Sequence, residues 1–271
     1  MIKAKVIESS FNDENILTTV LVTYPRIVHA EMLRHRMFSS SVSSSRAKPF
    51  SRFVEEEVAM PVLWQLNKPG MQGGDIHPDV ERCMDEWDKA AQSAFMRGMA
   101  LERLGLHKQI VNRVVEPFTH VDHLISATEW DNFFNLRMHP DADPTIQAVA
   151  TAIHDVMVDD YLDELAEKEW HLPFVTKRER DSHTYETLCM VSAARCARVS
   201  YSNHDGTNPS IARDVALAKK LIDSKHWSPF EHQATYAQHV NDFTHYMKDG
   251  SVWSNNFRGI IQYRSLIDNV D

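Results

Sequence analysis

The chain has 271 residues, a formal net charge of −9, 43% hydrophobic residues and 25% charged residues. This is the composition of an ordinary globular protein, and the length allows one large domain or two small ones. The negative charge argues against sequence-independent binding of a nucleic-acid polymer, because such binding depends on broad basic surfaces. Three cysteines without a Cys-x-x-Cys pair are typical of a reducing compartment.

No apolar signal-peptide core precedes the first predicted strand, and no run of about 18 apolar residues occurs. We therefore expect a cytoplasmic protein that makes no contact with a membrane.

The predicted elements begin with a hairpin. Residues 2–8 alternate between apolar and polar, and residues 16–22 are β-branched and apolar, so both are expected to be strands. A helix is expected to begin at Pro25, with Arg34 and Arg36 at its C-terminal end, where the helix dipole favours cations.

The next residues are expected to be irregular, and the middle of the chain helical. Residues 37–50 show no period and predict an ordered loop, and the glycine-rich residues 61–75 predict a surface excursion. Apolar residues at helical spacing predict four helices, over about 77–104, 107–115, 121–137 and 144–168.

Regular secondary structure is predicted again in the last third of the chain, after a charged stretch. Its predicted elements are helices over 191–199 and 211–224, a strand from near residue 230, and a strand or short helix over 256–267. Together the elements predict an α/β protein in an α+β arrangement, with a mixed sheet flanked by long helices. We expect residues 1–169 and 189–271 to form one domain, with 170–188 as a linker.

The most informative stretch surrounds Arg34-His35-Arg36. Between Glu31 and Glu55 there is no carboxylate, and the basic residues there are Arg34, Arg36, Arg46, Lys48 and Arg52. Guanidinium groups with serine hydroxyls between them suit phosphate oxygens. The stretch therefore predicts a site for a small anion, although a solvated basic loop is the alternative for such a run on its own.

Two further stretches carry candidate residues. Asn132 and Arg137 lie five apart at the end of an aromatic-rich segment, where Arg137 would need a partner; the structural alternative is a pair with Asp141 or Asp143. His232 ends a Ser-Pro-Phe-Glu-His turn, and a lone histidine is also compatible with a purely structural role.

These stretches together resemble the flavin-dependent thymidylate synthases. Arg34-His35-Arg36 followed by Ser44 and Arg46 matches the family signature. Three other family marks are an Ala-Arg-Val-Ser-Tyr stretch at 197–201, the turn at 228–232 and Asn-x-x-Asn-Leu-Arg at 132–137. The first two precede the signature in the family and follow it here, so the chain resembles a circularly permuted or rearranged member, in which the same contacts can be kept.

The resemblance implies roles for individual residues. Those matching the FAD ligands of the family are Arg34, His35, Arg36, Asn132, Ser200 and His232. Those matching its nucleotide ligands are Ser44, Arg46, Arg113 and Arg137, with Glu31 beside the nucleotide. We expect Arg137 to be catalytic, because a fixed guanidinium stabilises negative charge that develops on a pyrimidine carbonyl oxygen.

The activity implied is methylation of dUMP at C5 to dTMP. Methylenetetrahydrofolate would donate the carbon, reduced FAD the hydride, and NADPH the reducing equivalents, in a homotetramer. No metal site is expected, because no His-x-His or His-Glu-x-x-His pair with a carboxylate ligand occurs.

Several positions depart from the family pattern. Ser41-Val42 replaces Asn-Glu, Ser126 replaces Asn, Asp143 replaces Gln, and Glu31 replaces a Gln that is able to donate. Two alternatives therefore stay open. One is hydroxymethylation or hydroxylation of dUMP or dCMP for modified-base synthesis, and the other is a catalytically silent protein that binds flavin or nucleotide.

Overall fold

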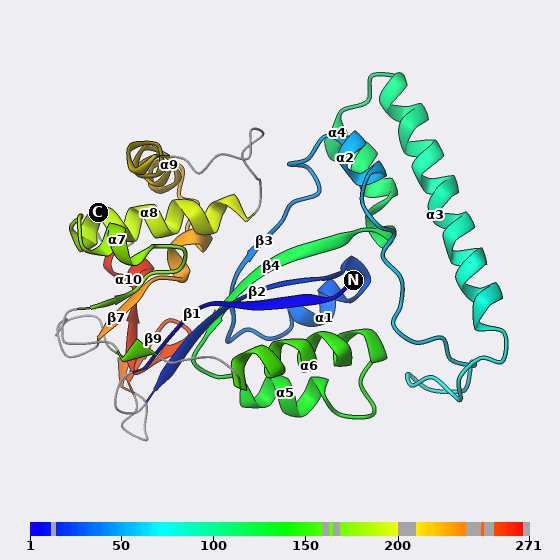
Figure 1. Ribbon diagram of the computed structural model, residues 1–271, viewed down its shortest axis with the longest axis horizontal. Helices are drawn as coiled ribbons and strands as arrows, with labels where there is room; N and C mark the ends of the chain where they lie inside the picture. Colours follow the sequence, from blue (N-terminus) through cyan, green and yellow to red (C-terminus); the bar gives the residue numbers. More distant parts are fainter. Residues whose placement is uncertain are drawn as a thin grey trace.

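The computed structural model describes residues 1–11, 15–158, 163–164, 169–199, 210–236, 245–246 and 252–267. A sheet lies at the centre of the molecule, with one group of helices below it, a long helix standing off to one side and a second group of helices on the other side (Figure 1). None of the described helices is long and apolar enough to cross a membrane.

The central sheet is mixed, as predicted. Within the described residues it has the order β3-β4-β2-β1-β5, formed by Ser39–Val42, His120–Ala127, Ile16–Pro25, Lys3–Phe11 and Asp163–Glu164. Neighbouring strands are antiparallel except β1 and β5, which are parallel. The hairpin of β1 and β2 confirms the prediction for the start of the chain, and the sheet with its flanking helices confirms the predicted fold class.

The prediction of one helix over 121–137 was wrong. Its first part is strand β4, which lies between β2 and β3, and the second part is the short helix α5, Asp131–Arg137. Residues 123–127 are all buried, because an interior strand is covered on both faces and then loses its two-residue alternation. Part of the expected loop 37–50 is likewise strand β3, followed by the short helix α2, Phe50–Val54.

Helices α5 and α6, Pro144–Val158, cover one face of the sheet (Figure 1). Their apolar residues share a core with the strands, which includes Val20, Val22, Ile125, Ile146, Val149 and Ile153. The predicted helix over 144–168 is therefore confirmed for its described part to Val158. The predicted first helix is shorter than expected: a 3-10 turn, Arg26–Val28, precedes α1, His29–Met32, so Arg34 and Arg36 follow the helix rather than ending it.

The long helix α3, Val80–Arg103, lies apart from the sheet, as predicted for 77–104 (Figure 1). Asp79 caps it by accepting a hydrogen bond from the backbone N–H of Arg82 at 3.1 Å. The predicted helix 107–115 is α4, Lys108–Val111, followed by a 3-10 turn over Asn112–Val114 and another over Glu116–Phe118.

The C-terminal part contains the remaining elements. Its helices are α7 Lys177–Arg180, α8 Tyr185–Arg198, α9 Ile211–Asp223 and α10 Tyr263–Ile267, with a 3-10 turn η4 at Ser228–Glu231. One small sheet has the order β11-β7-β6, formed by Ile260–Gln262, Ala234–Tyr236 and Trp170–His171. Another has the order β10-β9-β8, formed by Phe257–Arg258, Val252–Ser254 and His245–Tyr246.

The stretch expected as a linker, 170–188, is folded into this C-terminal part. Strand β6 pairs with β7, and His171 and Leu172 are fully buried. Arg180 of α7 forms an ion pair with Glu8 of β1 at 2.7 Å. The stretch is therefore a packed segment that ties the C-terminal part to the central sheet, and not an extended connection.

Candidate active site

A cleft of about 590 Å³ lies between the central sheet and the C-terminal part. Its walls come from β3 and the residues after it, the residues around the start of α4, the ends of α8 and α9, and the turn η4. The polar residues that line it include Ser41, Ser44, Arg46, His107, His226 and Ser228.

Two predicted nucleotide ligands, Ser44 and Arg46, lie together in this cleft. The hydroxyl of Ser44 accepts a hydrogen bond from the backbone N–H of Arg46 at 3.3 Å, which shapes the turn between them. The Arg46 side chain is exposed, and no carboxylate among the described residues forms an ion pair with it. Its guanidinium is thus available to an anion in the cleft.

His232 lies behind the cleft and is completely buried. Its Nε2 is 2.9 Å from the Ser41 hydroxyl, and its Nδ1 is 2.9 Å from the Ser126 hydroxyl. Burial lowers the pKa of His232 to about 3. Both ring nitrogens are engaged inside the chain, so the structure does not present His232 to a bound group, in contrast to the predicted flavin contact.

Ser41 and Ser126 are two of the departures from the family pattern, and both are partners of His232. A serine hydroxyl is shorter than an amide or carboxylate side chain and both donates and accepts. The two replacements are therefore coupled through one buried imidazole, which the sequence alone did not indicate.

A second cluster contains Arg137, His35 and Glu31. Arg137 donates from Nε to Nε2 of His35 at 2.9 Å, and from Nη2 to the backbone carbonyl of Glu31 at 3.5 Å. The predicted structural alternative, a pair with Asp141 or Asp143, is not formed. Asp143 instead caps α6 by accepting from the backbone N–H of Thr145 at 2.8 Å.

The charge state of His35 follows from this contact. Partial burial and the positive charge of Arg137 lower its pKa to about 4, so the ring is neutral near pH 7. The ring also packs edge-on against Phe133 with centroids 4.9 Å apart, which fixes its orientation. Beside it, Oε2 of Glu31 is buried and has no hydrogen-bond partner among the described residues, a costly arrangement unless a ligand supplies a donor.

The other predicted site residues are not members of these two clusters. Arg34, Arg36 and Asn132 are exposed. Arg113 is exposed and forms a 3.7 Å ion pair with Glu116. Ser200 lies outside the described residues.

The structure thus brings Ser44 and Arg46 together in the cleft, and groups Glu31, His35 and Arg137 elsewhere. His107 and His226 also line the cleft and were not predicted. No local pattern marked either of them. Ser228 was noted only as the first residue of the turn that carries His232.

The fold and the cleft define an α+β protein whose open pocket, lined by serine hydroxyls and a free guanidinium, suits an anionic small molecule. Residues 13–160 match the family described as thymidylate synthase complementing protein, Thy1. The chain belongs to this family. This confirms the predicted resemblance and the predicted class of enzyme, a thymidylate synthase-like methyltransferase that acts on pyrimidine nucleotides.

Solved structures with a related fold include a UMP/dUMP methylase, PolB, from Streptomyces cacaoi. Its structure bound with 5-Br dUMP is 16% identical, covers 59% of this chain and 90% of that chain, and has a TM-score of 0.50. Its structure bound with 5-Br UMP is 18% identical, covers 59% of this chain and 89% of that chain, with a TM-score of 0.48. No curated protein matches the chain.

Proposed function

We propose that the protein methylates dUMP at C5 to dTMP, with methylenetetrahydrofolate as carbon donor and NADPH as the source of reducing equivalents. The observation that carries the proposal is the placement of Ser44 and Arg46 in one cleft with a free guanidinium. A methylase of similar fold, PolB, has been solved with 5-Br dUMP, which supports a pyrimidine nucleotide as the ligand.

Ser44 and Arg46 bind the phosphate of the nucleotide in this proposal. A guanidinium offers two parallel charge-assisted hydrogen bonds to phosphate oxygens, and a nearby hydroxyl donates a third. Arg113 is close enough in sequence to α4 to contribute to the same region if its weak pair with Glu116 opens, since exposed ion pairs at 3.7 Å contribute little.

Arg137 is the proposed catalytic residue. Adding carbon at C5 builds negative charge on a carbonyl oxygen of the pyrimidine ring, and a guanidinium fixed before the reaction stabilises that charge. The neutral His35 ring accepts a hydrogen bond from Nε of Arg137, and the Glu31 carbonyl accepts one from Nη2. This leaves the N–H groups of Nη1 to face a ligand. His35 is then a positioning residue as well as a proposed flavin contact.

FAD is the cofactor that the family implies, and its fit to this chain can be judged from the predicted ligands. Arg34 and Arg36 are exposed, and neither forms an ion pair with the described residues, which suits a diphosphate. Together with His35 and Asn132 they are the residues that would hold FAD, and the bound flavin would supply hydride. His232 does not fit a direct contact, because it is buried with both nitrogens engaged.

A homotetramer in the cytoplasm completes the proposal. Neither Arg137 nor His35 nor Glu31 lines the cleft that contains Ser44 and Arg46. Assembly of several copies would allow the Arg137 cluster of one copy to meet the cleft of another. Residues 1–169 and 189–271 are proposed to act as one domain in each copy.

A second candidate function is the hydroxymethylation or hydroxylation of dCMP. It is favoured by the buried Oε2 of Glu31, which has no partner in the described part of the chain and would accept a hydrogen bond from the 4-amino group of cytosine. Uracil has a carbonyl at that position, which a carboxylate would repel.

The test combines a spectrum with product masses. The purified protein should be yellow, and its reduced flavin should be oxidised when dUMP and methylenetetrahydrofolate are added. The product from dUMP should have the mass of dTMP, whereas a hydroxymethylated or hydroxylated product from dCMP would establish the second candidate. A yellow protein that converts neither nucleotide would be the catalytically silent binding protein, and a protein that binds neither flavin nor nucleotide would refute both candidates.

A further inference from the structure

Six buried side chains form a continuous row of hydrogen bonds behind the cleft, which we call the buried polar row. Its contacts are Ser41 Oγ to His232 Nε2 at 2.9 Å, His232 Nδ1 to Ser126 Oγ at 2.9 Å, Ser126 Oγ to Thr19 Oγ1 at 2.6 Å, Thr19 Oγ1 to His171 Nε2 at 2.7 Å, and His171 Nδ1 to Ser10 Oγ at 2.9 Å. All six residues are at most 5% exposed. The row joins the central sheet to strand β6 of the β11-β7-β6 sheet and reaches the cleft at Ser41.

The row has a direction because each member has only one proton to donate. Burial lowers the pKa of both His171 and His232 to about 3, so each ring is neutral near pH 7. A neutral imidazole has one N–H and one bare nitrogen, and a hydroxyl has one O–H. Once one hydrogen bond in the row is assigned a donor, the donors of all the others follow.

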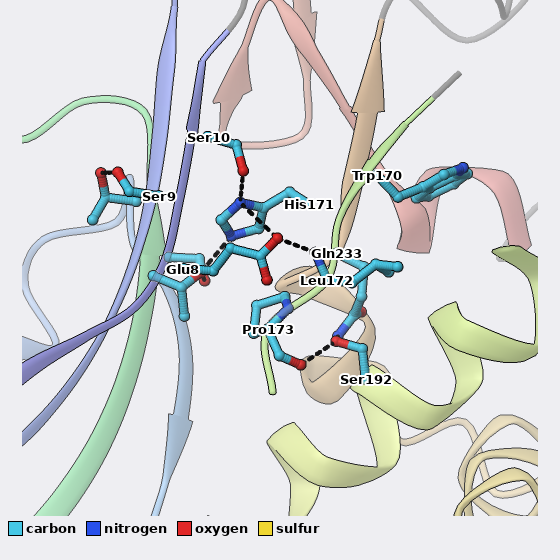
Figure 2. Close-up of polar contacts among 12 residues, drawn as sticks. Glu8, Ser9, Ser10, Trp170, His171, Leu172, Pro173, Ser192 and Gln233 are labelled. Carbon is cyan, nitrogen blue, oxygen red and sulfur yellow. Dashed lines mark hydrogen bonds and ion pairs between the residues drawn. The ribbon is translucent and has the colours of Figure 1, made fainter. Parts of the chain in front are cut away.

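The direction is set at the His171 end, beside β1. Figure 2 shows the His171 ring between Ser10 and the Glu8 carboxylate. Glu8 Oε1 is 4.0 Å from Nδ1 of His171 and accepts from the backbone N–H of Leu172 at 2.9 Å and from Arg180 at 2.7 Å. A carboxylate facing Nδ1 favours the tautomer with its proton there, so Nδ1–H donates to Ser10.

The remaining donors follow one by one. The bare Nε2 of His171 accepts from the Thr19 hydroxyl, so Thr19 must accept from Ser126. Ser126 has then used its proton and accepts from Nδ1–H of His232. The bare Nε2 of His232 accepts from Ser41, so the O–H of Ser41 points inward and only its lone pairs remain for the cleft.

We infer that Ser41 is a specificity-determining residue that accepts a hydrogen bond from the N3–H of a bound uracil ring. Thr19, Ser126, His171 and His232 are positioning residues that keep its hydroxyl proton turned away from the cleft. The inference rests on the proposed function. Three residues of extended chain span roughly 10 Å, so with phosphate at Ser44 the edge of the base reaches Ser41.

The test compares the binding of dUMP and 3-methyl-dUMP by calorimetry. Methylation of N3 removes the donor, so the wild-type protein should bind 3-methyl-dUMP about tenfold more weakly, the effect of one hydrogen bond of about 1.4 kcal/mol. Thr19→Val breaks the row and frees the Ser41 hydroxyl to rotate, so the preference should largely disappear. Thr19→Ser keeps a hydroxyl and should restore it.

Thr18→Val is the matched control. Thr18 is the neighbouring residue of β2, is also buried, and bonds to Ser9 at 2.9 Å outside the buried polar row. Both valine variants lose one buried hydroxyl. If the role of Thr19 is merely structural, the two variants should lose similar stability and should show the same preference for dUMP over 3-methyl-dUMP. A preference that survives in Thr19→Val would overturn the role of Ser41.

A second measurement needs no ligand. The ¹⁵N shifts of His171 and His232 in the wild-type protein should show protonated Nδ1 and bare Nε2 in both rings. A protonated Nε2 on either ring would overturn the inferred direction. If the wild-type protein does not bind dUMP at all, both the proposed function and the proposed ligand of Ser41 are refuted. If it binds dUMP and 3-methyl-dUMP equally well, only the inference about Ser41 is refuted.

Discussion

Arg137 donates from its Nε to Nε2 of His35 over 2.9 Å, across 102 residues of sequence. The bond joins the end of α5 to the segment that follows α1, and it requires a neutral His35. Partial burial and the charge of Arg137 itself lower the pKa of His35 to about 4, which keeps the ring an acceptor near neutral pH. The guanidinium is thus held in one orientation before any ligand arrives.

Replacing Arg137 with Lys should therefore reduce the rate of dTMP formation by about 100-fold, the scale found for removal of one preorganised donor. An ammonium keeps the charge but loses the planar fork and the Nε–H that His35 accepts. Single-turnover kinetics would measure the loss, and thermal unfolding should change little. The matched control is Arg82→Lys on α3, an exposed arginine. An unchanged rate in Arg137→Lys would exclude a catalytic role.

Glu31→Gln tests what the buried carboxylate does. None of the residues that the structure describes donates a hydrogen bond to Oε2 of Glu31, so this oxygen is a candidate acceptor for a ligand amino group. If it selects cytosine, the variant should lose affinity for dCMP by about tenfold and gain affinity for dUMP, because an amide donates to the uracil carbonyl. Calorimetry with both nucleotides measures the two changes. A variant with the same preference as the wild-type protein would show that Glu31 does not contact the base.

Much of the fold was predictable from the sequence. In these segments the local pattern of apolar residues agrees with the element that the tertiary structure contains. The alternation of β1 and β2, the apolar stripe of α3 and the spacing in α6 each produce the element that they indicate. The misassigned strand β4 differs because both of its faces are buried, so apolar residues at 121, 124 and 125 imitate helical spacing.

The site was predictable only where a motif marks it. Ser44 and Arg46 were found through the family signature, and both line the cleft. His171 was placed in an expected linker, and no pattern connects it to Thr19, which lies 152 residues away in sequence and 2.7 Å away in space. Such partners are set by how β6 packs on the central sheet, which a one-dimensional pattern does not contain.

Stability should fall on mild acidification. Burial lowers the pKa of His123, His171 and His232 from 6.5 to about 3 in the folded protein. Between these values the unfolded chain binds more protons than the folded chain, so the free energy of unfolding rises with pH. The contribution of the three histidines to stability is fully present above about pH 6.5. Below that pH, each of these histidines should lower the free energy of unfolding by about 1.4 kcal/mol per pH unit.

Urea unfolding at several pH values from 7.5 to 5.0 would measure this dependence. The interval stops at 5.0 because most carboxylates begin to titrate below it. In the His171→Gln variant the free energy of unfolding should change less steeply with pH, because glutamine does not titrate and the contribution of one histidine is lost. A free energy of unfolding that stays constant over the interval would show that the three rings are not buried as neutral groups.

The contact between α8 and α9 depends on Asp214, which is completely buried. It accepts a hydrogen bond from Nε of Arg195 at 3.1 Å and one from Arg198, and Arg195 also pairs with Glu179 at 2.6 Å. Asp214→Asn removes the carboxylate with which Arg198 pairs and leaves Arg195 with Glu179 alone, and both guanidinium groups lie in largely buried positions. The loss should be about 3 kcal/mol of unfolding free energy, as found when one partner of a buried pair is removed.

The same substitution should weaken nucleotide binding, because the two helices also supply one wall of the cleft. Ala197 of α8 and Leu221 of α9 both line it, and their spacing is held by the Asp214 contacts. Asp223→Asn is the control, since Asp223 is exposed at the end of α9 and should leave both stability and dUMP affinity unchanged. Urea unfolding and calorimetry with dUMP on the two variants measure both effects. If the Asp214→Asn variant is stable but binds dUMP more weakly, the Asp214 contacts set the shape of the cleft without determining the stability of the fold. If the variant is unstable but keeps its affinity for dUMP, this wall of the cleft does not contact the nucleotide.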